Sequence, residues 1–313
     1  MKKIFGTSIF AFILALSINN TTSAFAATES TSSSEDNENV INYTPATEEQ
    51  KRIEQIVIQA DIQARKEAYA ELKPVYGKFS AELLEDTKIY QDIEDTKLFQ
   101  DTVQSKIDRK IKKFGITRIE DETDPQMGIL ASPPTTEITI NKPSIYTSSQ
   151  GYFIMASAHW KKDSWGTKYW YHHRPSFGSS VGGEDGLGIY FSNTTNLEIS
   201  TSSFYTLDNF DRSYNTNLNP SVSRPEGVYY KSQDVYSSLL EQPYYTWDRS
   251  YISVWPTFKG KVDTVARTHW THTWSSAKIT SVGVSNSGFS IGISSVSNAY
   301  DGVSTQGTSV TYK

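Results

Sequence analysis

The sequence of 313 residues contains no cysteine. Disulfide bonds, thiolate zinc sites, a cysteine nucleophile and lipid attachment at a cysteine are therefore excluded together. Basic residues are outnumbered as well, with 30 Lys and Arg against 35 Asp and Glu and a formal charge of −5. This acidic balance argues against a nucleic-acid partner, because a general nucleic-acid-binding protein needs a net basic face.

The familiar catalytic motifs are also missing. The sequence has no G-x-S-x-G, no H-E-x-x-H, no Walker loop, no dinucleotide fingerprint and no D-x-D-x-D-G calcium loop. The carboxylates of the second half are scattered, so their spacing identifies no glycosidase pair. Glu184 and Asp185 lie among glycines, which is typical of a turn and also compatible with calcium ligands. The sequence predicts no cofactor and no metal, leaves the catalytic residues unknown, and favours a binding protein over an enzyme.

Only one long uncharged apolar run is present, over residues 4–18, directly after the basic residues Lys2 and Lys3. Ala24-Phe25-Ala26 then gives the small-x-small pattern of a signal-peptidase site. The run is short for the about 20 residues that a membrane span needs. We therefore expect residues 1–26 to be a cleaved signal peptide and the protein to be secreted and extracellular, with no covalent cell-wall or lipid anchor. Secretion without cysteine is typical of a Gram-positive bacterium.

The composition of the remaining chain changes three times. Residues 27–43 are acidic and Ser-rich, which predicts a disordered tail. Residues 44–118 are dense in charge of both signs and predict a helical region. Residues 119–138 combine acids with prolines, the mark of a linker. Residues 139–313 contain all seven Trp and all five His, and they predict a β-sandwich domain.

The helical region shows apolar residues at helical spacing. One run is Ile53, Ile56, Val57, Ala60, Ala64 and Ala68, and the second is Phe99, Val103, Ile107, Ile111 and Phe114. Thr44-Pro45 or the capping box of Thr47 with Gln50 starts the first helix, and Pro74 with Gly77 is expected to interrupt it. Gly115 is placed to end the second helix. The result is an amphipathic hairpin or small bundle, interpreted as a structural stalk, a pro-region that covers the later domain, or a partner-binding or membrane-active unit.

The last block shows the alternation of half-buried strands. Leu187, Ile189 and Phe191 alternate with small or polar residues, and a second such run begins at Phe289. Ten strands are predicted: 139–141, 151–160, 186–192, 197–201, 227–231, 251–258, 265–274, 279–284, 289–294 and 309–312. The predicted fold class is α+β, with the helical hairpin or bundle followed by an all-β antiparallel sandwich, jelly-roll-like or alternatively a closed β-barrel.

Two aromatic segments are the candidate ligand-binding sites. On a strand, Trp270, His272 and Trp274 share one face and form a flat strip that could stack on sugar rings. The alternatives are that these residues fill the core, or that His269 and His272 bind a metal. The densest aromatic stretch contains Trp165, Tyr169 and Tyr171. The rings of this stretch cannot all face one core. The stretch therefore indicates either a recognition surface or an edge strand with tyrosines on its solvent-exposed face.

These observations favour a secreted, non-enzymatic protein whose β-sandwich recognises extracellular or cell-wall polysaccharide through an aromatic surface. The expected partner is a glycan or another cell-surface ligand. The second hypothesis is a secreted effector or toxin with a helical pro-region, because the Ser- and Thr-rich end of the chain alternates as pore-forming hairpins do. An extracellular hydrolase is the third.

Overall fold

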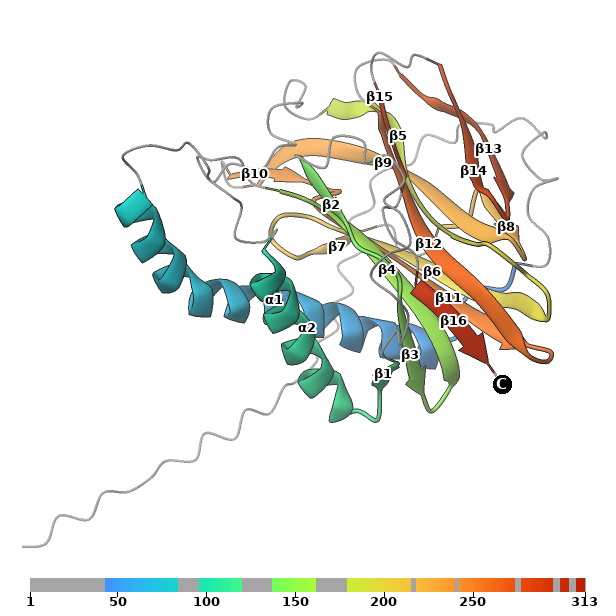
Figure 1. The fold of residues 1–313 in the computed structure, drawn as a ribbon. Coiled ribbons are helices and arrows are strands. Elements are labelled where there is room, and N and C mark those ends of the chain that lie inside the picture. Colours follow the sequence, from blue (N-terminus) through green and yellow to red (C-terminus); the bar gives the residue numbers. More distant parts are fainter. Residues whose placement is uncertain are drawn as a thin grey trace, which may run out of the picture. The chain divides into compact units, whose positions relative to one another are not determined.

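The computed structural model describes residues 43–83, 96–119, 137–161, 179–214, 218–239, 242–273, 277–294, 299–303 and 308–312. Two antiparallel sheets form the centre of this part of the chain (Figure 1). We call them the first and the second sheet. All of the described residues belong to one compact unit.

The first sheet has the strand order β1-β3-β4-β11-β6-β7, with β2 paired to β4. Its strands are β1 (Thr117–Ile119), β2 (Ile138–Ile140), β3 (Ser144–Ser148), β4 (Gly151–Trp160), β6 (Leu197–Leu207), β7 (Ser213–Tyr214) and β11 (Arg249–Phe258). The second sheet has the order β10-β9-β5-β12-β15, with β8 on β9 and β16 on β12. Its strands are β5 (Ser179–Phe191), β8 (Val222–Arg224), β9 (Gly227–Leu239), β10 (Gln242–Tyr245), β12 (Val262–Thr273), β15 (Ala299–Val303) and β16 (Thr308–Tyr312).

The main core lies between these sheets. Leu187, Ile189 and Phe191 of β5 point into it, as their alternation predicts, and meet Ile252 and Val254 of β11 in the same cluster. The predicted antiparallel sandwich is therefore confirmed. The alternative of a closed barrel is wrong, because neither sheet closes on itself within the described ranges. The jelly-roll arrangement stays a prediction.

Each of the ten predicted strands overlaps a strand of the structure. The predicted turn at Glu184 and Asp185 is wrong, because both residues lie inside β5 and pair with β9. The register of that pairing shifts between Ser180 and Glu184. The neighbouring glycines thus mark an irregularity within a strand rather than its end, a position where glycine is common.

Helix α1 (Glu48–Leu83) begins at the predicted capping box. The Gln50 backbone N–H donates to the Thr47 hydroxyl at 3.2 Å, and the Thr47 backbone N–H donates to the Gln50 amide oxygen at 2.9 Å. The predicted interruption at Pro74 and Gly77 is wrong, because the helix continues through both. The φ angle of proline suits a helix, so its cost is the lost hydrogen bond and a steric clash with the preceding turn.

Helix α2 (Lys97–Lys112) buries Phe99, Val103, Ile107 and Ile111. The fifth residue of the predicted run, Phe114, is 60% exposed. The helix ends before it, because Gly115 adopts a φ of +72° and its N–H bonds back to the Lys112 carbonyl. This left-handed residue is the predicted glycine stop, and it turns the chain into β1.

Both helices cover the outer face of the first sheet (Figure 1). Their apolar faces share a second core with Phe153, Tyr205 and Trp255 of that sheet. The strand β1, which follows α2 directly, pairs with β3. The helices therefore contact the sandwich itself. The linker predicted over residues 119–138 stays a prediction, since residues 120–136 lie outside the described residues.

A separate hairpin lies on the outer face of the second sheet. It consists of β13 (Ile279–Ser285) and β14 (Gly288–Ile293), which pair only with each other among the described strands. Its apolar residues form a small third core with Val222 and Tyr229. None of the helices that the structure describes is long and apolar enough to span a membrane.

Candidate functional site

An open cavity of about 310 Å³ lies where the start of α1 meets the edges of β4, β6, β11 and β16. Four aromatic residues line it: Tyr152, Trp255, Phe258 and Tyr312. Four side chains with hydrogen-bonding groups complete the lining: Gln50, Gln150, Ser200 and Thr257, together with Gly151 and Pro256. Six separate elements therefore contribute to one concave surface, counting the turn between β3 and β4.

The aromatic wall is held together by ring contacts. Phe258 and Tyr312 stack with their ring centroids 4.7 Å apart, and Tyr152 meets them edge-on at 5.6 and 5.8 Å. These three residues are half-buried and pack against the main core, whereas Trp255 is 2% exposed and belongs to the core that the helices share with the first sheet. The register shift of β11 between Trp255 and Pro256 falls in the middle of this wall. Trp255 pairs with Thr201 and Pro256 with Ile199, so the unpaired residue of this bulge is Ser200 of β6, which also lines the cavity.

The wall of the cavity is tied to α1 through Glu54. This buried carboxylate accepts hydrogen bonds from the Trp255 indole at 2.6 Å, from the Tyr205 hydroxyl at 2.5 Å and from the Ser253 hydroxyl. Burial raises the pKa of Glu54 and outweighs these three hydrogen bonds, which lower it. The first turn of the same helix supplies Gln50, whose amide oxygen is used in the capping box. Its NH₂ group is the part of this side chain that can donate to a ligand.

A second cluster of titratable groups lies inside the sandwich. Asp185 of β5, Asp234 of β9 and His272 of β12 are all fully buried. The His272 Nδ1 lies 2.7 Å from the Asp185 carboxylate, which also accepts the Thr273 backbone N–H at 2.9 Å. Tyr245 of β10 donates its hydroxyl to Asp234 and lies 3.3 Å from Asp185. The cluster is thus a connected hydrogen-bond network.

Burial dominates the electrostatics of this cluster. It raises the pKa of Asp185, and together with the charge of Asp185 it raises the pKa of Asp234. It lowers the pKa of His272 to about 4. We therefore expect a neutral imidazole and at least one protonated carboxyl at neutral pH. The three side chains offer ligand atoms within 4.8 Å of one another, so they are the described residues that could hold a divalent cation.

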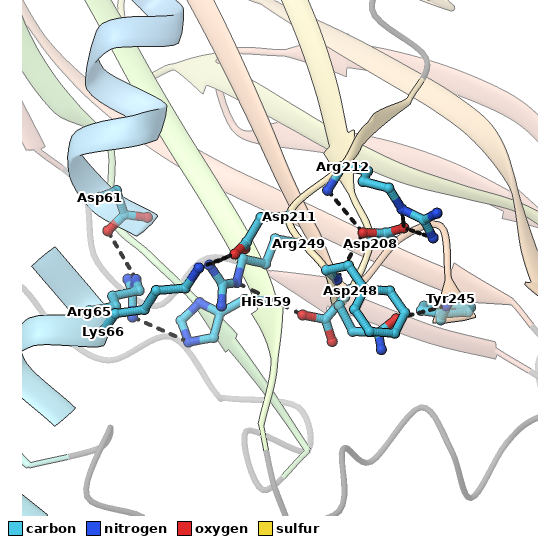
Figure 2. A network of polar contacts seen from close by, with 12 residues as sticks. Asp61, Arg65, Lys66, His159, Asp208, Asp211, Arg212, Tyr245, Asp248 and Arg249 are labelled. Atoms are coloured by element: carbon cyan, nitrogen blue, oxygen red, sulfur yellow. Dashed lines mark hydrogen bonds and ion pairs between the residues drawn. The ribbon is translucent and has the colours of Figure 1, made fainter. Parts of the chain in front are cut away.

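A third network joins α1 to the sandwich (Figure 2). Asp61 and Arg65 of α1 form a buried pair at 2.9 Å, and Tyr251 of β11 donates its hydroxyl to Asp61 at 2.7 Å. Burial alone would raise the pKa of Asp61, but Arg65 and the Tyr251 hydrogen bond outweigh it and lower that pKa. This arrangement orients α1 on the first sheet.

The same network continues through the loop between β6 and β7. The Asp211 carboxylate forms ion pairs with Lys66 of α1 and with Arg249 of β11, the latter at 3.2 Å. Asp208 in turn accepts the backbone N–H groups of Phe210 and Arg212 and the Arg212 guanidinium. These bonds shape the loop that carries Asp211, so the network is structural.

The residues predicted as ligand-binding fall in two places. Trp165, Tyr169, Tyr171 and Trp274 lie outside the described residues, and their role stays a prediction. Trp270 and His272 are 2% and 0% exposed, with stacked rings in the core. That burial agrees with the alternative in which they fill the core, because a ligand cannot stack on a covered ring. His269 and Thr271 are hydrogen-bonded to each other at 3.2 Å.

Sequence reasoning missed the cavity and the buried cluster. Tyr152, Phe258 and Tyr312 come from strand ends far apart in the chain, and Asp185 and Asp234 become neighbours only through the β5–β9 register. No spacing in one sequence encodes such a pairing. The Gly-rich surroundings of Asp185 were the one local signal, and they mark the irregularity of β5.

Comparison with known proteins gives no relative. No family model, no curated protein and no solved structure matches this chain.

Proposed function

We propose that the protein is a secreted, non-enzymatic binding protein that recognises extracellular or cell-wall polysaccharide, and that the aromatic cavity is its binding site. The observation that carries the proposal is the combination of an aromatic wall with hydrogen-bonding side chains in one open cavity. Sugar rings have apolar C–H faces that stack on aromatic rings, while their hydroxyl groups need donors and acceptors. A cavity of about 310 Å³ lies at the small end of ligand sites.

The charge of the lining supports a neutral sugar. None of the residues that line the cavity in the described part of the chain is Asp, Glu, Lys, Arg or His. Hydrolysis of a glycosidic bond ordinarily uses two carboxyl groups that flank the bond. The lining thus favours binding without turnover, and it favours uncharged polysaccharide over acidic polymers.

The segment around Trp165, Tyr169 and Tyr171, with Trp274, remains proposed as a second aromatic surface for the same polymer. An extended glycan often contacts more than the ring held in a cavity, and two modest sites on one chain raise the overall affinity. Secretion is part of the proposal and rests on the signal-peptide pattern over residues 1–26.

A pull-down on insoluble polysaccharides tests the proposal. The mature protein, the variant Tyr312→Ala and the control Tyr69→Ala are incubated with purified cell walls and with neutral polysaccharides. Tyr69 is an exposed aromatic residue on α1, outside the cavity lining. The proposal expects retention of the mature protein and of Tyr69→Ala, a two- to tenfold weaker retention (about 0.5–1.5 kcal/mol) of Tyr312→Ala, and no release of reducing ends. Equal retention of both variants, or steady release of sugar, contradicts it.

A further inference from the structure

The hairpin β13–β14 continues the register of the strand pair from which it arises. Thr273, the last residue of β12, pairs with Ala299, the first residue of β15. Ile279 at the start of β13 pairs with Ile293 at the end of β14. Thr273 and Ile279 are six positions apart in the sequence, and so are Ile293 and Ala299. Straightened, the chain from His269 to Val303 would therefore form one antiparallel hairpin without a register slip at the junction.

This hairpin has two chemically different faces. The cross-strand pairs on one face are apolar: Ile279 with Ile293, Val282 with Ile291, and Val284 with Phe289. The pairs on the other face are small or polar: Ser281 with Gly292, Gly283 with Ser290, and Ser285 with Gly288. The register shift between Ile279 and Ser281 keeps Ile279 on the same face as Val282. The irregularity thus preserves the apolar stripe.

The apolar face rests on the second sheet where that sheet lacks side chains. A Cβ atom on Gly188 would lie 2.7 Å from the Phe289 ring, and one on Gly227 would lie 3.0 Å from a methyl group of Val284. Of the hairpin's apolar residues, Ile279 and Val282 are buried, whereas Val284, Phe289 and Ile291 are only half-buried. Its backbone pairs with no other described strand, so this shallow contact and the hydrogen bond from the Asn286 side-chain amide to the Phe191 carbonyl at 3.0 Å hold the hairpin on the sheet.

The composition and the length of the hairpin suit a lipid bilayer. Strand β13 has 7 residues and β14 has 6, and as continuations of β12 and β15 they would reach the about 9–11 residues of a membrane-crossing strand. Within residues 277–296 the only charged residue is Lys278, and there is no proline. The tip, Asn286-Ser287, is polar but uncharged, which keeps the cost of moving it across a bilayer low.

We propose that β13–β14 swings off the second sheet and inserts into a lipid bilayer as the continuation of β12 and β15. The apolar face then meets acyl chains and the Ser- and Gly-rich face meets water. Several copies must associate, because the outer edges of one inserted hairpin would leave backbone groups unpaired in the lipid. This permeabilising activity goes beyond the proposed glycan binding, which would concentrate the protein at a cell surface.

Dye release from vesicles tests the proposal with two neighbouring substitutions. Ile291→Arg places a charge on the apolar face, and Ser290→Arg places the same charge on the polar face. Both residues lie on the surface hairpin, and a thermal melt of each variant checks that it folds. With vesicles of phosphatidylcholine, phosphatidylserine and cholesterol, we expect release by the mature protein, whole or cut after Glu120 or Glu122 by a glutamate-specific protease. Ile291→Arg should lower the rate at least about tenfold and Ser290→Arg less than about twofold.

A second measurement follows the hairpin directly. Because the protein has no cysteine, a single cysteine at 284, 285, 290 or 291 can carry an environment-sensitive fluorophore. The proposal expects blue-shifted emission and quenching by acyl-chain nitroxides at positions 284 and 291, and neither change at 285 and 290. Absence of dye release from both whole and cut protein, or a membrane response that does not alternate along the strands, overturns it.

Discussion

The indole N–H of Trp255, in β11, donates a 2.6 Å hydrogen bond to the Glu54 carboxylate of α1. The same carboxylate accepts the hydroxyls of Tyr205 and Ser253. One residue of the helix therefore satisfies three buried donors of the first sheet, and one of them belongs to the cavity wall. The helical region is in this way connected to the proposed binding site.

Glu54→Ala should destabilise the protein strongly, since it leaves three buried donors without their acceptor. The expected loss is about 3 kcal/mol or more of unfolding free energy. Glu54→Gln should cost much less, because an amide oxygen still accepts two of these bonds and the raised pKa of Glu54 shows that burial disfavours its charge. Urea denaturation of the two variants measures the difference. Equal losses would contradict the role given to the hydrogen bonds.

The buried pair of Asp61 and Arg65 gives a second prediction. The folded-state pKa of Asp61 is lowered, so its contribution to stability is present above the unfolded-state pKa of about 3.9 and is lost as the pH falls through the folded-state value. Asp61→Asn should cost roughly 3–5 kcal/mol at pH 7, because Arg65 keeps a buried charge without its partner. The penalty of Asp61→Asn should shrink at pH 3. A penalty independent of pH would show that packing, and not charge, is responsible.

The buried imidazole of His272 predicts a different pH window. Its pKa is about 4 in the folded protein against about 6.5 in an unfolded chain. The unfolded state therefore binds more protons between these values, and this group alone lowers the unfolding free energy by roughly 3 kcal/mol as the pH falls from about 6.5 to about 4. The raised pKa values of Asp185 and Asp234 act in the opposite direction, because their contribution is lost as the pH rises.

A comparison with His272→Asn isolates the imidazole. Asparagine can still donate to Asp185 but does not titrate. The difference in unfolding free energy between the two proteins should change by roughly 3 kcal/mol from pH 6.5 to pH 4, with the variant gaining relative stability in acid. Chemical denaturation at four pH values across this window gives that difference. A constant difference would mean that His272 does not titrate with the shifted pKa.

Much of the fold follows from local patterns in the sequence. Leu187, Ile189 and Phe191 could be assigned to one face, since strand alternation is a property of neighbouring residues. The capping box of Thr47 and Gln50 and the glycine stop at Gly115 are local as well. Local rules predict an interruption at Pro74, because they do not include the packing of α1 against the first sheet, which stabilises the helix.

The sites could not be predicted in the same way. Tyr152 and Tyr312 meet at 5.8 Å across one cavity, although they are far apart in the sequence. Alternation predicts that His272 shares a face with Trp270 and Trp274, but it does not predict which face of the strand is covered. That choice depends on how β12 lies between β5 and β15.

The close packing of the hairpin β13–β14 over Gly188 of the second sheet gives a further prediction. Gly188→Ala puts a methyl group 2.7 Å from the rings of Phe289 and Tyr229, so it should cost about 1–3 kcal/mol. Gly283→Ala is the matched control, because the nearest atom to its new methyl group lies 3.8 Å away. Thermal melts compare the two. Hydrogen exchange of β13 and β14 should rise in Gly188→Ala only, and unchanged exchange would argue against the contact.

The aromatic cavity is proposed to bind a neutral glycan, and a calorimetric titration measures this binding. A soluble oligosaccharide from a retained polysaccharide is titrated into the mature protein, Gln150→Ala and Gln59→Ala. Both glutamines are exposed, but only Gln150 lines the cavity. We expect one site per chain and a Kd raised about two- to tenfold in Gln150→Ala, corresponding to one lost hydrogen bond, with the Kd of Gln59→Ala unchanged. Identical binding by all three proteins, or no heat with any neutral glycan that the polysaccharides yield, would contradict it.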